Sequence, residues 1–165
     1  MKKPSVYLET SAISSLWYEG SDVVMLARRF HVREWWDRRH FELWTSAVAE
    51  VELRAGTYHH QDDCLRMVRR LRYLPATSAV RDLKVEIVRL GLVPPTKEAD
   101  AAHLAMAATH STDFLLTWNH AHLANAAVQS RLEAVCEGWG LRVPLMVSPE
   151  SIPQVRFGQS IRKDR

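Results

Sequence analysis

Four residues spread along the chain are of the types that bind a divalent cation: Glu9, Glu52, Asp100 and Asn119. Carboxylate and amide oxygens are hard ligands of the kind that Mg²⁺ and Mn²⁺ prefer, and they leave coordination positions for water and a phosphate. An ion held in this way lowers the pKa of a bound water, which prepares that water to attack a phosphodiester. If these residues meet in space, the chemistry to expect is metal-assisted hydrolysis.

Glu9 and Asn119 each follow an apolar run that predicts a β-strand. Residues 6–8 precede Glu9, and residues 113–118 precede Asn119. In a parallel sheet both side chains lie at the carboxyl edge, where ligands of α/β proteins bind. Taken singly, Glu9 also fits a solvated loop and Asn119 an ordinary turn.

Glu52 interrupts an apolar pattern on a predicted helix. Val48, Val51 and Ala55 lie at positions i, i+3 and i+7, and Glu52 at i+4 lies on the same face. Glu50, two residues away, lies on the opposite and wetter side. Burial of an unpaired carboxylate costs several kcal/mol, so a cation would explain Glu52. The alternative is a Glu at the edge of the stripe that reaches solvent.

Asp100 opens a predicted helix that is otherwise apolar almost all round. The polar residues of this helix form one stripe, made of Asp100, His103 and His110. Acidic residues also favour the first turn of a helix because of its dipole, which is the competing explanation for Asp100. We expect His103 to be a core histidine with its hydrogen bonds satisfied rather than a metal ligand.

Two histidine pairs offer a different metal chemistry, namely His120 with His122 and His59 with His60. Neither pair has the HExxH context of a zinc protease, and both lie in polar segments, so we expect solvated side chains.

Arginines also gather in one run, at positions 66, 69, 70 and 72. With Trp35, Trp36 and Trp118 as stacking partners this run is a candidate nucleic-acid surface, although a solvated face is the simpler explanation.

The elements that must position these residues alternate along the chain. We expect strands at 6–8, 41–45, 113–118 and 143–147, and helices at 10–17, 21–39, 47–55, 61–74, 79–90, 97–110 and 120–138. Thr10 or Ser11, Ser46 and Thr96 are the expected helix caps. The pattern predicts an α/β fold, a three-layer α/β/α sandwich whose central parallel sheet has four to five short strands. In the second helix the expected core residues are Val24, Leu26, Ala27, Phe30 and Trp35.

Composition limits the class of protein. A chain of 165 residues with 47% hydrophobic residues supports one domain, expected at 1–149, followed by a polar tail at 150–165 that we expect to be flexible. Cys64 and Cys136 are far apart and outside any CxxC pair, which indicates buried thiols in a reduced compartment. Because no long apolar run is present, we expect a cytoplasmic protein without a membrane partner. The net charge of +3 permits a polyanionic partner.

Four short motifs together resemble the ordered motifs of the PIN domain family. They read VYLETS at 6–11, ELRAG at 52–56, DAAHLA at 100–105 and LLTWN at 115–119, and the resemblance runs from about Val6 to about Pro149. It implies a compact α/β fold with an acidic pocket that binds Mg²⁺ or Mn²⁺ and cleaves RNA. Many members are toxins of toxin–antitoxin pairs, which implies an antitoxin protein as a partner.

By position in these motifs, the resemblance implies that Glu9, Glu52 and Asp100 are the first three acidic residues and that Asn119 stands where many members have a fourth. Thr10, His103 and Thr117 are the expected supporting residues. Glu in place of the more common Asp at the first position and the neutral Asn119 are two departures from the family pattern. With a neutral Asn119, a second ion is expected only together with substrate.

The sequence thus leads to two hypotheses. The first is a metal-dependent endoribonuclease that hydrolyses single-stranded or structured RNA, the toxin of a toxin–antitoxin pair in its narrower form. The alternative is a catalytically weakened PIN-like module that binds RNA or a protein. We expect a homodimer or antitoxin contact on the early helices, around Trp17, Phe30 and Trp35.

Overall fold

The computed structural model describes residues 3–37 and 40–152. Within this part of the chain, five strands alternate with seven helices. The elements are β1 (Ser5–Leu8), α1 (Thr10–Leu16), α2 (Val23–Asp37), β2 (Glu42–Thr45), α3 (Ala47–Arg54), α4 (Gln61–Val68), β3 (Arg72–Tyr73), α5 (Ser78–Arg89), α6 (Glu98–Thr109), β4 (Phe114–Leu116), α7 (Ala126–Gly138) and β5 (Leu145–Val147).

The five strands form one sheet in the order β3-β2-β1-β4-β5, and every pair of neighbours is parallel. β1 is the central strand, because Val6 lies opposite both Leu43 of β2 and Phe114 of β4. The order of the strands reverses between β1 and β4, since the chain first builds outward on one side of β1 and then on the other.

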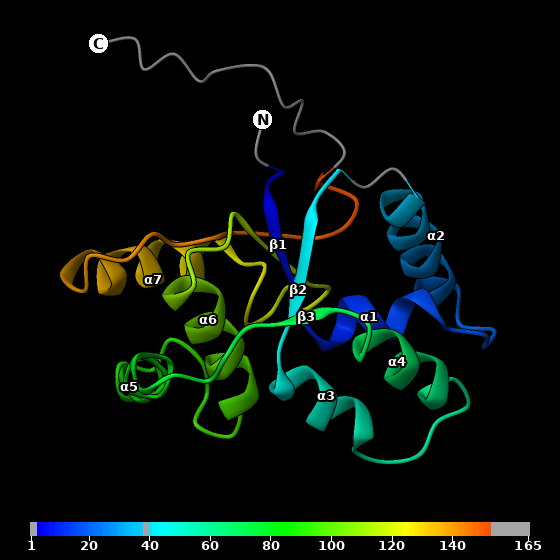
Figure 1. The fold of residues 1–165 in the computed structure, drawn as a ribbon, viewed down its shortest axis with the longest axis horizontal. Helices are drawn as coiled ribbons and strands as arrows, with labels where there is room; N and C mark the ends of the chain where they lie inside the picture. Colours follow the sequence, from blue (N-terminus) through cyan, green and yellow to red (C-terminus); the bar gives the residue numbers. More distant parts are fainter. Residues whose placement is uncertain (1–2, 38–39, 153–165) are drawn as a thin grey trace, which may run out of the picture.

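Alternating side chains of the strands separate two hydrophobic cores, one on each face of the sheet. Val6, Leu8 and Leu116 pack with helices α1 to α4. Tyr7 and Leu115 pack on the other face with helices α5 to α7. Figure 1 shows these two groups of helices on opposite sides of the strands. The predicted three-layer α/β/α sandwich with a central parallel sheet is therefore confirmed.

Several predicted boundaries were wrong for tertiary reasons. The helix expected at 61–74 ends at Val68, because turns follow and residues 72–73 pair with β2 as a short fifth strand. The helix expected at 120–138 begins only at Ala126, where the Asn125 side chain accepts hydrogen bonds from two backbone amides. Thr96 is not a cap either, since Lys97 occupies the cap position of α6 without a side-chain hydrogen bond.

Helix α2 was the least accurately predicted element. Among its expected core residues only Trp35 is buried, whereas Val24, Leu26, Ala27 and Phe30 are exposed, Phe30 by 59%. The reason is that α2 rests on α1 through its second half, including the buried Val32, while its first half extends beyond the core. The predicted end of this helix, at 38–39, lies outside the described residues.

The remaining expectations concern the thiols, the chain end and the membrane. Cys64 and Cys136 are both buried and free, as predicted. The packed core extends to Ile152, and the rest of the predicted tail, 153–165, lies outside the described residues. Among the helices that the structure describes, none combines the length and the apolar character needed to cross a membrane.

The central position of β4 gives a stability prediction. Leu115 is fully buried between β1 and β5, so Leu115→Ala should lower the free energy of unfolding by about 2–5 kcal/mol. Val85→Ala, on the exposed face of α5, is the control and should change it by less than about 0.5 kcal/mol. Urea unfolding followed by tryptophan fluorescence measures both. Equal losses in the two variants would contradict this assignment of the core.

Candidate functional site

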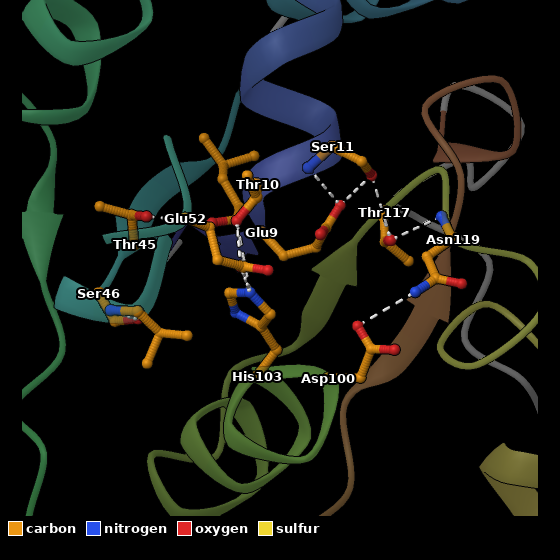
Figure 2. A network of polar contacts seen from close by, with 12 residues as sticks. Glu9, Thr10, Ser11, Thr45, Ser46, Glu52, Asp100, His103, Thr117 and Asn119 are labelled. Carbon is orange, nitrogen blue, oxygen red and sulfur yellow. Dashed lines mark hydrogen bonds and ion pairs between the residues drawn. The ribbon is translucent and has the colours of Figure 1, made fainter. Parts of the chain in front are cut away.

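Polar side chains gather at the carboxyl edge of the sheet, beside the reversal of strand order between β1 and β4. Glu9 follows β1, and Thr117 and Asn119 follow β4. Ligands of open α/β sheets bind at this kind of crevice. Figure 2 shows the seven predicted residues Glu9, Thr10, Glu52, Asp100, His103, Thr117 and Asn119 in this one region. Strand-end position was thus a good guide for Glu9 and Asn119.

Glu9 is buried, with only 4% of the residue exposed, and one of its oxygens caps helix α1. Oε1 accepts hydrogen bonds from the backbone amides of Ser11, at 2.9 Å, and Ala12, at 3.3 Å, and from the Ser11 hydroxyl. The predicted cap, Thr10 or Ser11, was therefore wrong. Oε2 has no hydrogen-bond partner among the described residues, so this oxygen is available to a cation.

A chain of buried hydrogen bonds leads from β1 to Glu52 on α3. The Tyr7 hydroxyl lies 2.7 Å from Ser46 Oγ and 2.7 Å from His103 Nδ1. On the other side of the ring, His103 Nε2 lies 2.6 Å from Glu52 Oε2, which also accepts a hydrogen bond from the Thr10 hydroxyl. Both ring nitrogens of His103 are engaged, so His103 is the satisfied core histidine that the sequence indicated.

The Glu52 end of this chain has a fixed direction, because an ionised carboxylate only accepts hydrogen bonds. Ser46 Oγ accepts the amide hydrogen of Val48, so its own hydrogen is free to go to Tyr7. Burial raises the pKa of Tyr7 above its ordinary value, which keeps the phenol protonated and able to donate to His103 Nδ1. Nε2–H of His103 then donates to Glu52. Every polar group of this chain of hydrogen bonds therefore has a partner.

Glu52 is half-buried, and its pKa is the balance of opposing effects. Burial raises the pKa, whereas the hydrogen bond and charge of His103 and the hydrogen bond from Thr10 lower it, and the net effect is a lowered pKa. The carboxylate therefore stays ionised. Its side chain is 34% exposed, which leaves the second oxygen accessible from the side of Glu9 and Asp100.

The apolar-stripe argument for Glu52 was wrong, although the residue does lie in the site. Val51 is 66% exposed and Ala55 is also exposed, and the buried face of α3 consists of Ala49 and Leu53. Glu52 borders this face on the side of α6. Glu50, by contrast, forms the predicted ion pair on the wet side, 2.6 Å from Arg54.

Asp100, in the first turn of α6, is held by residues of the turn that follows β4. Its Oδ1 accepts a hydrogen bond from Asn119 Nδ2 at 3.2 Å, and its Oδ2 lies 2.8 Å from His122 Nδ1. Asn119 Oδ1 accepts the backbone amide hydrogen of His122 at 3.1 Å, which brings this histidine back toward Asp100. The Asp100 side chain is 13% exposed, so it is largely enclosed.

Hydroxyls at the strand ends tie the two halves of the site together. Thr117 Oγ1 accepts the backbone amide hydrogen of Asn119 at 2.9 Å. Ser11, at the start of α1, accepts the amide hydrogen of Trp118 at 2.8 Å and donates to Glu9. The carboxylate after β1 and the amide after β4 are therefore positioned by one connected set of hydrogen bonds.

Tyr7, Ser46 and His122 are the residues of the site that sequence reasoning missed. Tyr7 lies in an otherwise aliphatic strand, and its buried hydroxyl requires partners, which was the available signal. His122 was considered only as part of a metal-binding histidine pair. Trp35 and Trp118 are buried, so these two of the three candidate stacking rings are core residues, in agreement with the simpler explanation.

The three carboxylates come from different elements and face one space, as Figure 2 shows, with Asn119 beside Asp100. As they stand, no three His, Cys, Asp or Glu side chains in the described residues are close enough to hold a metal ion together. The donor set fits Mg²⁺ or Mn²⁺ by type, since the oxygens are hard and one oxygen of Glu9 is unshared. Binding an ion here therefore requires the carboxylates to move closer together.

Fold and site together define a parallel α/β protein with a carboxylate cluster where the strand order reverses. The sequence matches no protein-family model and no curated protein. The four motifs and the arrangement of their residues are thus what supports a function for this protein.

The Tyr7 hydroxyl provides a test of the hydrogen-bond chain. Tyr7→Phe leaves His103 and Ser46 buried without this partner, so the free energy of unfolding should fall by about 1–3 kcal/mol. Tyr18→Phe is the matched control, because the Tyr18 hydroxyl only accepts an exposed amide hydrogen, and it should lose less than about 0.5 kcal/mol. Urea unfolding of both variants measures these losses. An unchanged free energy of unfolding in Tyr7→Phe would contradict the hydrogen-bond chain through Tyr7.

Proposed function

We propose that the protein is a metal-dependent endoribonuclease of the PIN type that acts in the cytoplasm. The observation that carries the proposal is that Glu9, Glu52 and Asp100, which lie far apart in sequence, face one space at the carboxyl edge of the sheet. Ionised carboxylates that face one space repel one another, so a divalent cation between them is the natural compensation. The motif resemblance supports the same reading.

Each acidic residue has a distinct task in this proposal. Glu9 Oε2 and Asp100 would hold the Mg²⁺ or Mn²⁺, and Glu52 would complete the ligands or orient a bound water. Such an ion lowers the pKa of a bound water and stabilises charge on the phosphate. Glu52, which His103 and Thr10 keep ionised, would be the group that takes up the proton of the attacking water. Asn119 and His122 hold Asp100 in place.

The second candidate is a PIN-like module that binds RNA or a protein without cutting it. The observation that favours this reading is that both oxygens of Asp100 are engaged by Asn119 and His122. Calorimetric titration with Mn²⁺ separates the two candidates. A nuclease binds the ion in a manner that depends on Asp100, whereas a binding module retains RNA affinity and gives no carboxylate-dependent heat.

A toxin role and its partners form the narrower part of the proposal. Val23, Leu26 and Phe30, at positions i, i+3 and i+7, form an exposed apolar face on α2, where an antitoxin or a second copy of the chain would bind. The exposure of Phe30 is compatible with the partner contact expected from the sequence. Trp35 does not, because it is buried within the core.

Paired substitutions on α6 test the catalytic assignment. Asp100→Asn should lower the rate of Mn²⁺-dependent cleavage of single-stranded RNA by about 100-fold or more, because even residues behind a metal ligand cost 10–100-fold when replaced. Glu98→Gln, two residues earlier on the same helix, is the control, since Glu98 is exposed and pairs with Lys84. Its rate should equal that of the wild type. Equal rates for Asp100→Asn and wild type exclude the assignment.

A second matched pair on α3 separates Glu52 from its neighbour. Glu52→Gln should reduce the cleavage rate by about tenfold or more, because the amide neither takes up a proton nor balances the ion's charge. Glu50→Gln removes a charge two residues away, from an exposed ion pair, and should leave the rate unchanged. Single-turnover cleavage with Mn²⁺ measures both variants. Comparable losses would indicate a general charge effect instead of a role for Glu52.

A further inference from the structure

Three basic side chains surround the indole ring of Trp118, directly beside the carboxylate site. The guanidinium carbon of Arg28 lies 5.5 Å from the centre of the ring. The imidazoles of His31 and His120 each lie with their ring centres 6.4 Å from that of Trp118. Arg28 and His31 belong to α2, whereas His120 follows β4, so the tertiary fold brings them together.

Trp118 is a fixed platform for these side chains. The residue is only 5% exposed, its Nε1–H donates to Ser15 Oγ at 3.0 Å, and its backbone N–H donates to Ser11 Oγ. Ser11 also binds Glu9, and Asn119 is the next residue in the chain. The distance between the basic group and the acidic site is therefore set by the same hydrogen bonds that build the site.

Arg28 is available to a ligand. Other arginines of the fold face carboxylates, for example Arg89 with Glu86 and Arg142 with Asp113. Within the described residues Arg28 has no carboxylate partner, and its one hydrogen bond is a long contact of 3.9 Å to the sulfur of Met25. A guanidinium binds phosphate oxygens through two parallel hydrogen bonds, and the ring beneath Arg28 holds it in place.

The chemistry of the ligand follows from these surroundings. Because the Trp118 ring is covered, it offers no face to a nucleobase, so this group of residues suits recognition of an anion and not base stacking. The neighbouring carboxylates repel a polyanion. Cationic and N–H donor groups at the rim of the carboxylate site offset this repulsion, since contacts to phosphates supply most of the binding free energy of a nucleic acid that is not read by sequence.

Resting on the proposed nuclease function, we propose that Arg28, His31 and His120 form a subsite for a backbone phosphate of single-stranded RNA, next to the phosphodiester that is cleaved. Arg28 supplies the permanent charge, and the two imidazoles beside the ring supply N–H donors. The subsite places the chain of the substrate across the acidic cluster without reading its sequence.

The test is the salt dependence of RNA binding by the full-length protein. A fluorescein-labelled single-stranded RNA of mixed sequence is titrated in EDTA, where cleavage cannot occur, and anisotropy gives the affinity at several salt concentrations. Each phosphate contact on a single strand contributes about 0.7 to the slope of log K against log salt. Arg28→Gln should therefore reduce the slope by about 0.7, and Arg28→Lys should retain it.

Arg81→Gln is the matched control, because Arg81 is exposed on α5, in the opposite helical layer, and the charge change is identical. It should leave the slope unchanged. In cleavage assays with Mn²⁺, Arg28→Gln and the double variant His31→Gln/His120→Gln should raise KM several-fold at unchanged kcat. Circular dichroism and thermal unfolding confirm that the variants fold.

The outcomes separate this proposal from the nuclease function. Suppose that Asp100→Asn cleaves RNA like the wild type, whereas Arg28→Gln binds RNA more weakly and with a smaller salt slope. The phosphate subsite is then supported and the catalytic assignment of Asp100 fails. The subsite is overturned if wild-type protein does not bind the RNA, if Arg28→Gln binds like wild type, or if Arg81→Gln loses as much slope as Arg28→Gln.

Discussion

The central strand β1 carries the constraint on which both the fold and the site depend. A central parallel strand is buried on both faces, so a polar side chain within it must find hydrogen-bond partners. Tyr7 meets this requirement through Ser46 and His103, each of which lies at the carboxyl edge of the sheet. Packing of the strand and orientation of Glu52 are therefore coupled through one hydroxyl.

Each carboxylate of the cluster has its own set of hydrogen-bond donors. Backbone amides hold Glu9, His103 and Thr10 hold Glu52, and the turn after β4 holds Asp100. Hydrogen bonds to the ionised form offset the burial that favours protonation, as the lowered pKa of Glu52 shows. A site that keeps several anions close together is destabilised by itself, and any cation bound there stabilises the folded state.

The sequence was a reliable guide where one strong local signal was enough. Apolar runs marked β1, β2, β4 and β5, and position at a strand end was the right reason to select Glu9. Prediction from the sequence failed where pairing or packing between distant segments determines the local structure. β3 has two residues and exists because Leu74 and its neighbours bond to β2, and helical periodicity placed Val24 in a core that α2 does not reach at that point. Glu52 was selected by a wrong argument, since Val51 and Ala55 of its predicted stripe are exposed.

The two residues that depart from the PIN pattern have defined places in the structure. One oxygen of Glu9 caps α1 while the other has no hydrogen-bond partner among the described residues, so one carboxylate can both cap the helix and offer an oxygen to a cation. Asn119 is oriented by the backbone amide of His122, which can only donate and so fixes the amide oxygen there and the nitrogen toward Asp100. Both ends of Asn119 are thus used in building the turn. We infer that Asn119 positions Asp100 instead of binding an ion, so the proposed centre is a one-ion site.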